Sequence, residues 1–196
     1  MEFVFPLIMG IGLAAATGFR IFIPFLVLCL AARGEYISLP ENFDWLMTDT
    51  ALMTLIAATS LEVLSFYVPW LDNALDTIAS PVSLVAGTVA VMATGGVQEM
   101  DPVLGWVIAI VGGGGSAAMT QGLSVLTRGG SLLASGGAAN PLVSTAENTG
   151  STGFSLAAIF APLLIIPLLL LLLIVLWKLL RSRKKTSPNG EAPAET

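Results

Sequence analysis

The sequence predicts an all-α protein, a polytopic transmembrane helical bundle of five to six spans, and three observations lead to this prediction. Hydrophobic residues make up 55% of the 196-residue chain, and its mean hydropathy is +0.87. Charged residues make up only 11%, less than half of the roughly 25% that is typical of soluble domains. Several apolar stretches reach the roughly 20 residues that a membrane-spanning helix needs. The clearest of them runs from Phe154 to Leu180.

The first apolar segment, residues 3–32, is long for a single span. It contains the small-residue run GLAAATG and, shortly after it, one cation, Arg20. Its glycines and Pro24 are expected to bend or break the helix. An acidic connection at residues 33–50 leads to a second span from Ala51 to Val68, which contains Glu62.

The middle of the chain is predicted to contain two further spans. A turn and a short amphipathic piece at residues 69–81 lead into a third span from Val82 to Thr94. A fourth span, Val103 to Leu126, contains the glycine run 112–115, for which close helix packing is the expected role. This run lacks the GK[ST] sequence of a nucleotide-binding P-loop.

Residues 127–153 are too polar to face lipid and too rich in small residues for a typical water-facing loop. We expect a re-entrant or buried segment here, because irregular backbone at membrane depth is tolerated only inside protein or beside water. Asn140 and Pro141 are expected to start a helix as its N-cap and first residue. The chain from Pro141 to Leu180 is then either one long kinked helix or two consecutive spans.

Two similar segments favour six spans arranged as an inverted three-plus-three repeat. The run GLAAATG at residues 12–18 resembles GSAAMTQG at residues 115–122, and a glutamate follows each copy. The half-repeats would be residues 1–97 and 98–182. Inverted repeats with interrupted helices are a recurring plan of transporters. Chance similarity between strings rich in glycine and alanine is the alternative.

The C-terminal end of the chain is predicted to lie in the cytoplasm. Five of the eight basic residues lie between Lys178 and Lys185, beside the last apolar segment. The positive-inside rule places such clusters on the cytoplasmic side. We therefore expect residues 1–185 to form the transmembrane domain of a protein of a bacterial-type inner (plasma) membrane. Residues 186–196 are expected to be a disordered cytoplasmic tail.

Six charged residues lie within or beside the apolar segments: Arg20, Glu62, Asp72, Asp76, Arg128 and Glu147. A charge at a helix centre costs about 2.5–3.5 kcal/mol on insertion scales, so such residues usually face the bundle interior and find a partner. The simplest pairing joins Arg20 to Glu62 or Asp72, and Arg128 to Glu147 or Asp76. With Asn140, these residues form the candidate polar site near the membrane midplane.

The composition argues against catalysis and cofactor binding. The chain has no histidine and a single cysteine, Cys29. A Ser/His or Cys/His catalytic site is therefore impossible, and the commonest metal ligand is missing. We expect no enzymatic activity, no cofactor, no metal site and no nucleic-acid partner. Cys29 lies in an apolar run and is expected to be a buried thiol.

Three stretches of the chain carry a family resemblance: GLAAATGFRIFIPFL, LEVLSFYVPWLDNALDTIASPVSLVAG and TRGGSLLASGGAANPLVSTAEN. Together they resemble the domain of unknown function 4126 (DUF4126) family of small integral membrane proteins, over about residues 5–182. The chain departs from the family pattern at Asn148, where the family tends to have a second acid. The resemblance implies a helical membrane protein and supplies no agreed activity.

Several functions fit these observations. The first is a small transporter or channel with a charged midplane site for an ion, a proton or a small anion. The second is a non-transporting membrane scaffold or assembly factor, in which the buried charges are structural ion pairs. A membrane enzyme that acts on lipid is a third alternative. The expected partners are the lipid bilayer and the transported ion, and the sequence is compatible with a homo-oligomer.

Overall fold

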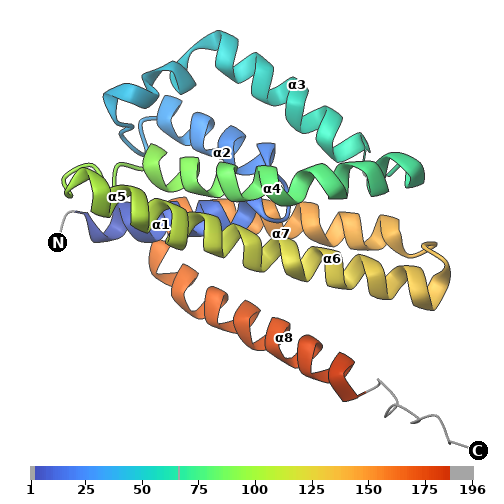
Figure 1. Ribbon diagram of the computed structural model, residues 1–196. Helices are drawn as coiled ribbons and strands as arrows, with labels where there is room; N and C mark the ends of the chain where they lie inside the picture. Colours follow the sequence, from blue (N-terminus) through green and yellow to red (C-terminus); the bar gives the residue numbers. More distant parts are fainter. Residues whose placement is uncertain (1–2, 66, 186–196) are drawn as a thin grey trace, which may run out of the picture.

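The computed structural model describes residues 3–65 and 67–185, without the side chains of residues 69–77 and 182–185. All regular secondary structure in this part of the chain is helical, which confirms the all-α part of the predicted fold class. The helices run back and forth along one common direction, and α8 diverges from the rest of the bundle (Figure 1).

The first half of the chain begins with a helical hairpin. Helix α1 (Val4–Thr17) runs into the bundle and α2 (Phe22–Arg33) returns from it (Figure 1). At 1.5 Å per residue the two arms are about 21 Å and 18 Å long, shorter than the roughly 30 Å of a bilayer core. The 3-10 helix η1 (Glu41–Met47) and helix α3 (Asp49–Ser65) follow.

The second half consists of longer helices. Helix α4 (Pro69–Ala93) precedes a nearly continuous segment made of α5 (Pro102–Ile108), the π-helical turn η2 (Ala109–Gly114) and α6 (Gly115–Ser135). Helix α7 (Asn140–Phe160), the 3-10 turn η3 (Pro162–Leu164) and α8 (Ile165–Lys185) complete the described chain.

Helix α4 corrects the sequence prediction for residues 69–94. The amphipathic piece and the third span form one helix, with Pro81 inside it. A proline removes one backbone hydrogen bond, but a helix inside a bundle continues where neighbouring groups satisfy the freed carbonyl.

The segment 127–153 is also more regular than predicted. Residues 127–135 continue α6 and residues 140–153 belong to α7, so only a four-residue turn separates the two helices. Gly136 and Gly137 enter this turn with φ values of +60° and +88°, which side chains rarely allow. Asn140 is the first residue of α7, and Ala139 is its N-cap.

The stretch Phe154 to Leu180 is interrupted. Helix α7 ends at Phe160, and α8 starts at Ile165. The break falls at Ala161 because the residue before a proline disfavours the helical conformation. Of the two alternatives for residues 141–180, the structure therefore has two consecutive helices.

By length and composition, two segments of the described chain are able to cross a membrane, Pro102–Ser135 and Pro162–Arg181. A third is added if η1 and α3, which are bent by 68° to each other, count as one span. The shorter apolar helices are Val4–Thr17, Phe22–Arg33 and Ile78–Ala93. The count of five to six spans stays a prediction.

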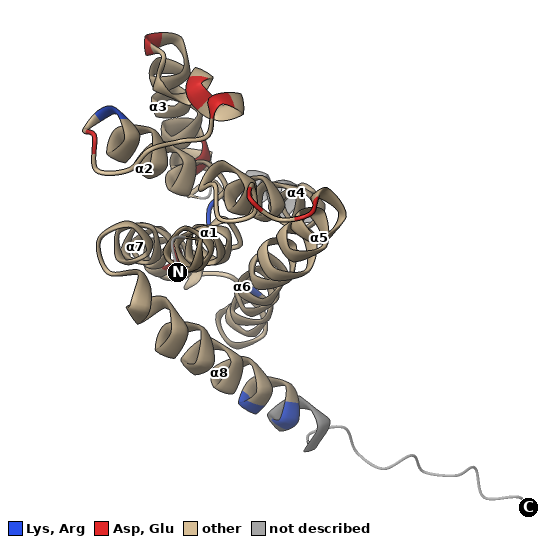
Figure 2. Ribbon diagram, turned by 90° about the vertical axis from the view of Figure 1, so that its left-hand side faces the viewer, with Lys and Arg blue, Asp and Glu red and all other residues tan. Residues whose placement is uncertain are grey.

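Helix α1 lies at the centre of the bundle. It packs against α4, α6 and α7, and the view along the bundle shows these helices around it (Figure 2). Every side chain from Leu13 to Thr17 is buried. A Cβ atom on Gly18 would lie 1.8 Å from Oγ1 of Thr120, so only glycine permits this crossing of α1 and α6.

The glycine run has the packing role that the sequence suggests, but not at every position. A Cβ atom on Gly113 would lie 2.4 Å from the carbonyl oxygen of Gly87, so η2 and α4 touch through their backbones. A Cβ atom on Gly115 would meet nothing within 4 Å.

The two similar segments of the suggested repeat occupy different positions. GLAAATG forms the end of α1, whereas GSAAMTQG starts α6 within a longer helical segment. The inverted repeat therefore stays a prediction.

Candidate functional site

The tip of the α1–α2 hairpin lies inside the bundle, where water cannot satisfy its backbone. Side chains from other helices do so. The carbonyl of Ala15 accepts a hydrogen bond from Oγ1 of Thr120 (2.7 Å), and the carbonyl of Ala16 accepts one from Oγ of Ser151 (3.1 Å). At the start of α2, Glu62 of α3 accepts hydrogen bonds from the backbone N–H groups of residues 21 and 22, at 2.7 Å and 3.0 Å.

Arg20 at this tip joins a buried charged cluster. Its Nη1 lies 3.0 Å from Oε2 of Glu147 on α7. Arg128 on α6 donates from Nε to Oε1 of the same carboxylate at 3.1 Å and from Nη2 to Oε2. The three side chains are only 1–5% exposed. One carboxylate therefore bridges two guanidinium groups from different parts of the chain, and we call these three residues the Arg–Glu–Arg cluster.

Polar groups around the cluster complete its hydrogen bonds. Nε of Arg20 donates to Oδ1 of Asn148, and Nη2 of Arg20 lies 3.4 Å from the carbonyl oxygen of Ser144. Nη2 of Arg128 reaches the hydroxyl of Ser144 at 3.4 Å, and Oγ of Ser124 donates to Glu147. The sequence analysis did not place Asn148, Ser144 and Ser124 in the site. The helical spacing of 144, 147, 148, 151 and 155 could have predicted a polar, inward face of α7.

The structure brings together three of the seven predicted site residues. Arg128 is paired with Glu147, one of the two partners suggested for it. The described ion pair of Arg20 is also with Glu147, which was not suggested for Arg20. The Glu62 carboxylate holds the first two backbone N–H groups of the α2 start and interacts electrostatically with Arg20.

One further predicted residue, Asn140, does not belong to the described cluster. Asn140 lies seven residues before Glu147 on α7, about 10 Å away along the helix axis. The side chains of Asp72 and Asp76 lie outside the described residues, so their predicted pairings are not addressed.

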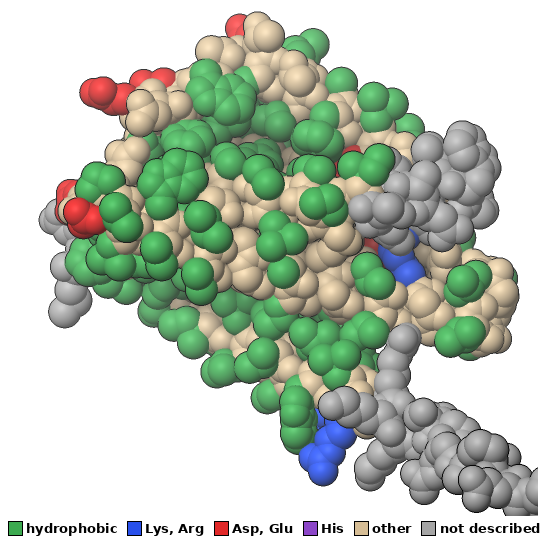
Figure 3. Space-filling view, in the orientation of Figure 1, with side chains coloured by type: hydrophobic (Ala, Val, Ile, Leu, Met, Phe, Trp, Pro, Cys, Tyr) green, Lys and Arg blue, Asp and Glu red, His purple; other side chains and the backbone are tan. Residues whose placement is uncertain are grey.

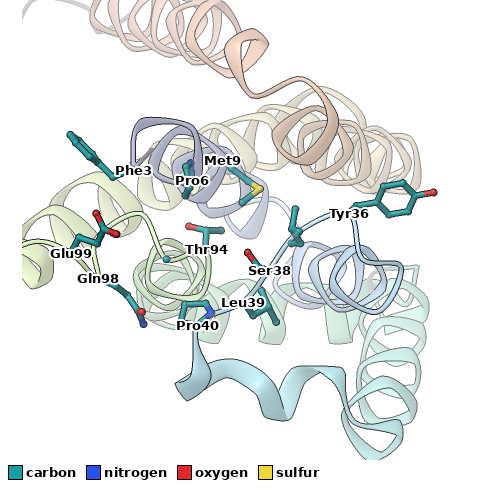
Figure 4. A pocket seen from close by; sticks show the side chains of 12 residues that line it. Phe3, Pro6, Met9, Tyr36, Ser38, Leu39, Pro40, Thr94, Gln98 and Glu99 are labelled. Atoms are coloured by element: carbon teal, nitrogen blue, oxygen red, sulfur yellow. The ribbon is translucent and has the colours of Figure 1, made fainter. Parts of the chain in front are cut away.

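A separate cavity of about 460 Å³ lies at the end of the bundle where α1 begins. The start of α1, the α2–η1 loop and the α4–α5 turn form its walls. Figure 4 shows Met9, Ser38 and Thr94 around its centre and Tyr36 extending outward. The cavity and the Arg–Glu–Arg cluster lie at opposite ends of α1. In the described part of the chain, no three His, Cys, Asp or Glu side chains are placed to hold a metal ion.

These features define a class: an all-helical protein with two or three apolar helices long enough to cross a membrane and a buried Arg–Glu–Arg cluster at a helix break. Within this class, the chain belongs to the DUF4126 family, a domain of unknown function, whose family model matches residues 7–182. This match confirms the resemblance seen in the sequence. Neither a curated protein nor a solved structure matches the chain.

Proposed function

We propose that the protein is embedded in a bacterial-type inner (plasma) membrane with its C-terminus in the cytoplasm. The charge at the two ends of the bundle supports this orientation. The end of α8 carries Lys178 and Arg181. The opposite end carries one basic residue, Arg33, and six acidic residues: Glu35, Glu41, Asp44, Asp49, Glu99 and Asp101. Figure 3 shows acidic side chains at one end of the bundle and basic ones at the end of α8, with hydrophobic side chains spread between them.

Within that membrane, the protein acts as a small transporter or channel for an ion, a proton or a small anion. The observation that carries this proposal is the α1–α2 hairpin, which ends inside the bundle and presents Arg20 to Glu147. Interrupted helices form the substrate sites of many transporters, because their ends supply polar groups at membrane depth.

The cluster suggests how a small anion could be held. Two guanidinium groups converge on one carboxylate, and guanidinium donors bind carboxylate, phosphate and similar anions through the same charge-assisted hydrogen bonds. A transported anion would replace the Glu147 carboxylate between Arg20 and Arg128.

A non-transporting scaffold or assembly factor is the second candidate, and the burial of the cluster favours it. Side chains that are 1–5% exposed and paired with one another are suited to fixing the register of the hairpin against α6 and α7. In this case the Arg–Glu–Arg cluster would stabilise the bundle without binding a substrate.

A flux assay in proteoliposomes separates the two candidates. Purified protein is reconstituted, and the uptake of chloride, nitrate, phosphate and protons is compared with that of empty liposomes. The variants are Arg20→Ala and Glu147→Gln, and the matched control is Asp49→Asn, which alters an exposed ion pair with Arg33. Transport predicts a flux that both cluster variants change by about tenfold or more and the control leaves unchanged. A flux equal to that of empty liposomes for all four would refute transport of small anions and protons and favour the scaffold.

A further inference from the structure

An apolar groove lies between α3 and α4, on a side of the bundle away from the cavity at the acidic end. Its volume is about 410 Å³. Helix α3 packs against α2 and η1, and the groove separates it from the middle of α4. Hydrophobic side chains border both helices on the face shown in Figure 3. Its walls include Phe22, Leu61, Ile78 and Val82, which are 38–66% exposed.

One charged side chain lines this apolar groove. Glu62 is the only ionisable group among the nine described residues of its walls, and none of them is basic. Its Oε1 accepts a hydrogen bond from the N–H of Ile21 at 2.7 Å, and its Oε2 accepts one from the N–H of Phe22 at 3.0 Å. These two bonds fix the carboxylate on the wall. Each oxygen has two lone-pair directions, so the carboxylate can still accept from a ligand.

A groove of this chemistry selects its ligand by charge and by apolar surface together. A carboxylate among apolar walls attracts a cation more strongly than it would in water. Small inorganic cations are disfavoured because the walls cannot supply the oxygen ligands that would replace their water. Anions are repelled, and a neutral apolar molecule gains nothing from Glu62.

We propose that the groove between α3 and α4 is a binding site for lipophilic organic cations, with Glu62 as the countercharge. The volume lies within the 300–1,000 Å³ of typical small-molecule sites. This inference is independent of the transport proposal, because it concerns binding at a lateral groove rather than flux through the Arg–Glu–Arg cluster.

The test uses two probes of equal size and opposite charge. Binding of tetraphenylphosphonium and of tetraphenylborate to the purified full chain in nonionic detergent is measured by equilibrium dialysis, with protein-free micelles as the blank. Tetramethylammonium serves as a cation without apolar surface. We expect tetraphenylphosphonium to bind at least about tenfold more tightly than either of the others, a difference of about 1.4 kcal/mol.

Two variants locate the site. Val82→Trp fills the groove and leaves Glu62 in place, and Glu62→Gln removes the charge. Each should weaken tetraphenylphosphonium binding by about tenfold or more. Val85→Trp is the matched control, since Val85 lies one turn further along α4, is 64% exposed and does not line the groove. This variant should bind tetraphenylphosphonium with the affinity of the unmodified protein. Equal binding of both tetraphenyl probes, or an unchanged affinity in Val82→Trp, would overturn the proposal.

Discussion

Replacing Glu147 by glutamine should destabilise the protein far more than the loss of an ordinary ion pair. The carboxylate of Glu147 is 5% exposed and accepts hydrogen bonds from Arg20, Arg128 and Ser124. Removing one partner of a buried ion pair costs about 3–5 kcal/mol, because the remaining charge loses its compensation in a low-dielectric environment. For a domain of this size, 1 kcal/mol corresponds to about 2–4 °C in Tm. The expected loss is therefore about 6–20 °C.

The assay is thermal unfolding of the purified protein in detergent, with Asp49→Asn as the matched control. Asp49 also pairs with an arginine, Arg33 at 2.8 Å, but its side chain is 89% exposed. Surface ion pairs of this kind contribute about 0–1 kcal/mol, so the control should lose no more than about 4 °C. Equal melting temperatures for Glu147→Gln and Asp49→Asn would refute the expected contribution of the buried Arg–Glu–Arg cluster to the free energy of unfolding.

Two further predictions use other parts of the bundle. Gly113→Ala should destabilise the protein by about 1–3 kcal/mol, because the new Cβ atom would lie 2.4 Å from the Gly87 carbonyl; Gly115→Ala, two residues away in open space, should be neutral or stabilising by up to about 1 kcal/mol. Chemical denaturation of both variants checks this, and similar losses would contradict the close contact of η2 and α4. In intact cells, a membrane-impermeant maleimide should label Glu99→Cys but not Lys178→Cys, and the native Cys29, which is fully buried, should stay silent. The reverse labelling pattern would refute the proposed orientation.

The fold class could be predicted from composition, but the helix boundaries could not. The break at Gly18 was predictable because glycines and Pro24 weaken a helix in this apolar segment. The continuity of α4 through Pro81 was not, since a proline usually kinks or ends a helix.

The secondary structure of the polar segment 127–153 was also not predictable from its sequence alone. Its serines, threonines and Glu147 suggested irregular or re-entrant structure. In the bundle the segment forms parts of two regular helices. Ser144, Glu147 and Ser151 lie on the buried face of α7, whereas Thr145, Thr149 and Thr152 on the same helix are exposed. Polarity along the chain therefore did not indicate the absence of a helix, and part of it marks a helix face that points into the bundle.

The candidate site was predictable in its residue types and not in its pairing. Insertion cost identifies Arg20, Arg128 and Glu147 as residues that need partners. Both arginines share one glutamate because the tip of the α1–α2 hairpin reaches α7. Arg20 and Glu147 are 127 positions apart in the sequence. No periodicity within either segment encodes this meeting.

The central position of α1 has a consequence for biosynthesis. Helix α1 emerges from the ribosome before α4, α6 and α7, yet these three later helices enclose it. Until residue 160 has been made, a 14-residue helix followed by an arginine has no complete surrounding in which to settle. The hairpin therefore lacks most of its packing partners until the later helices have been made, and the bundle closes around it late. Helix α8 is made last, and Ile165 at its start completes the packing around α1 at Gly12.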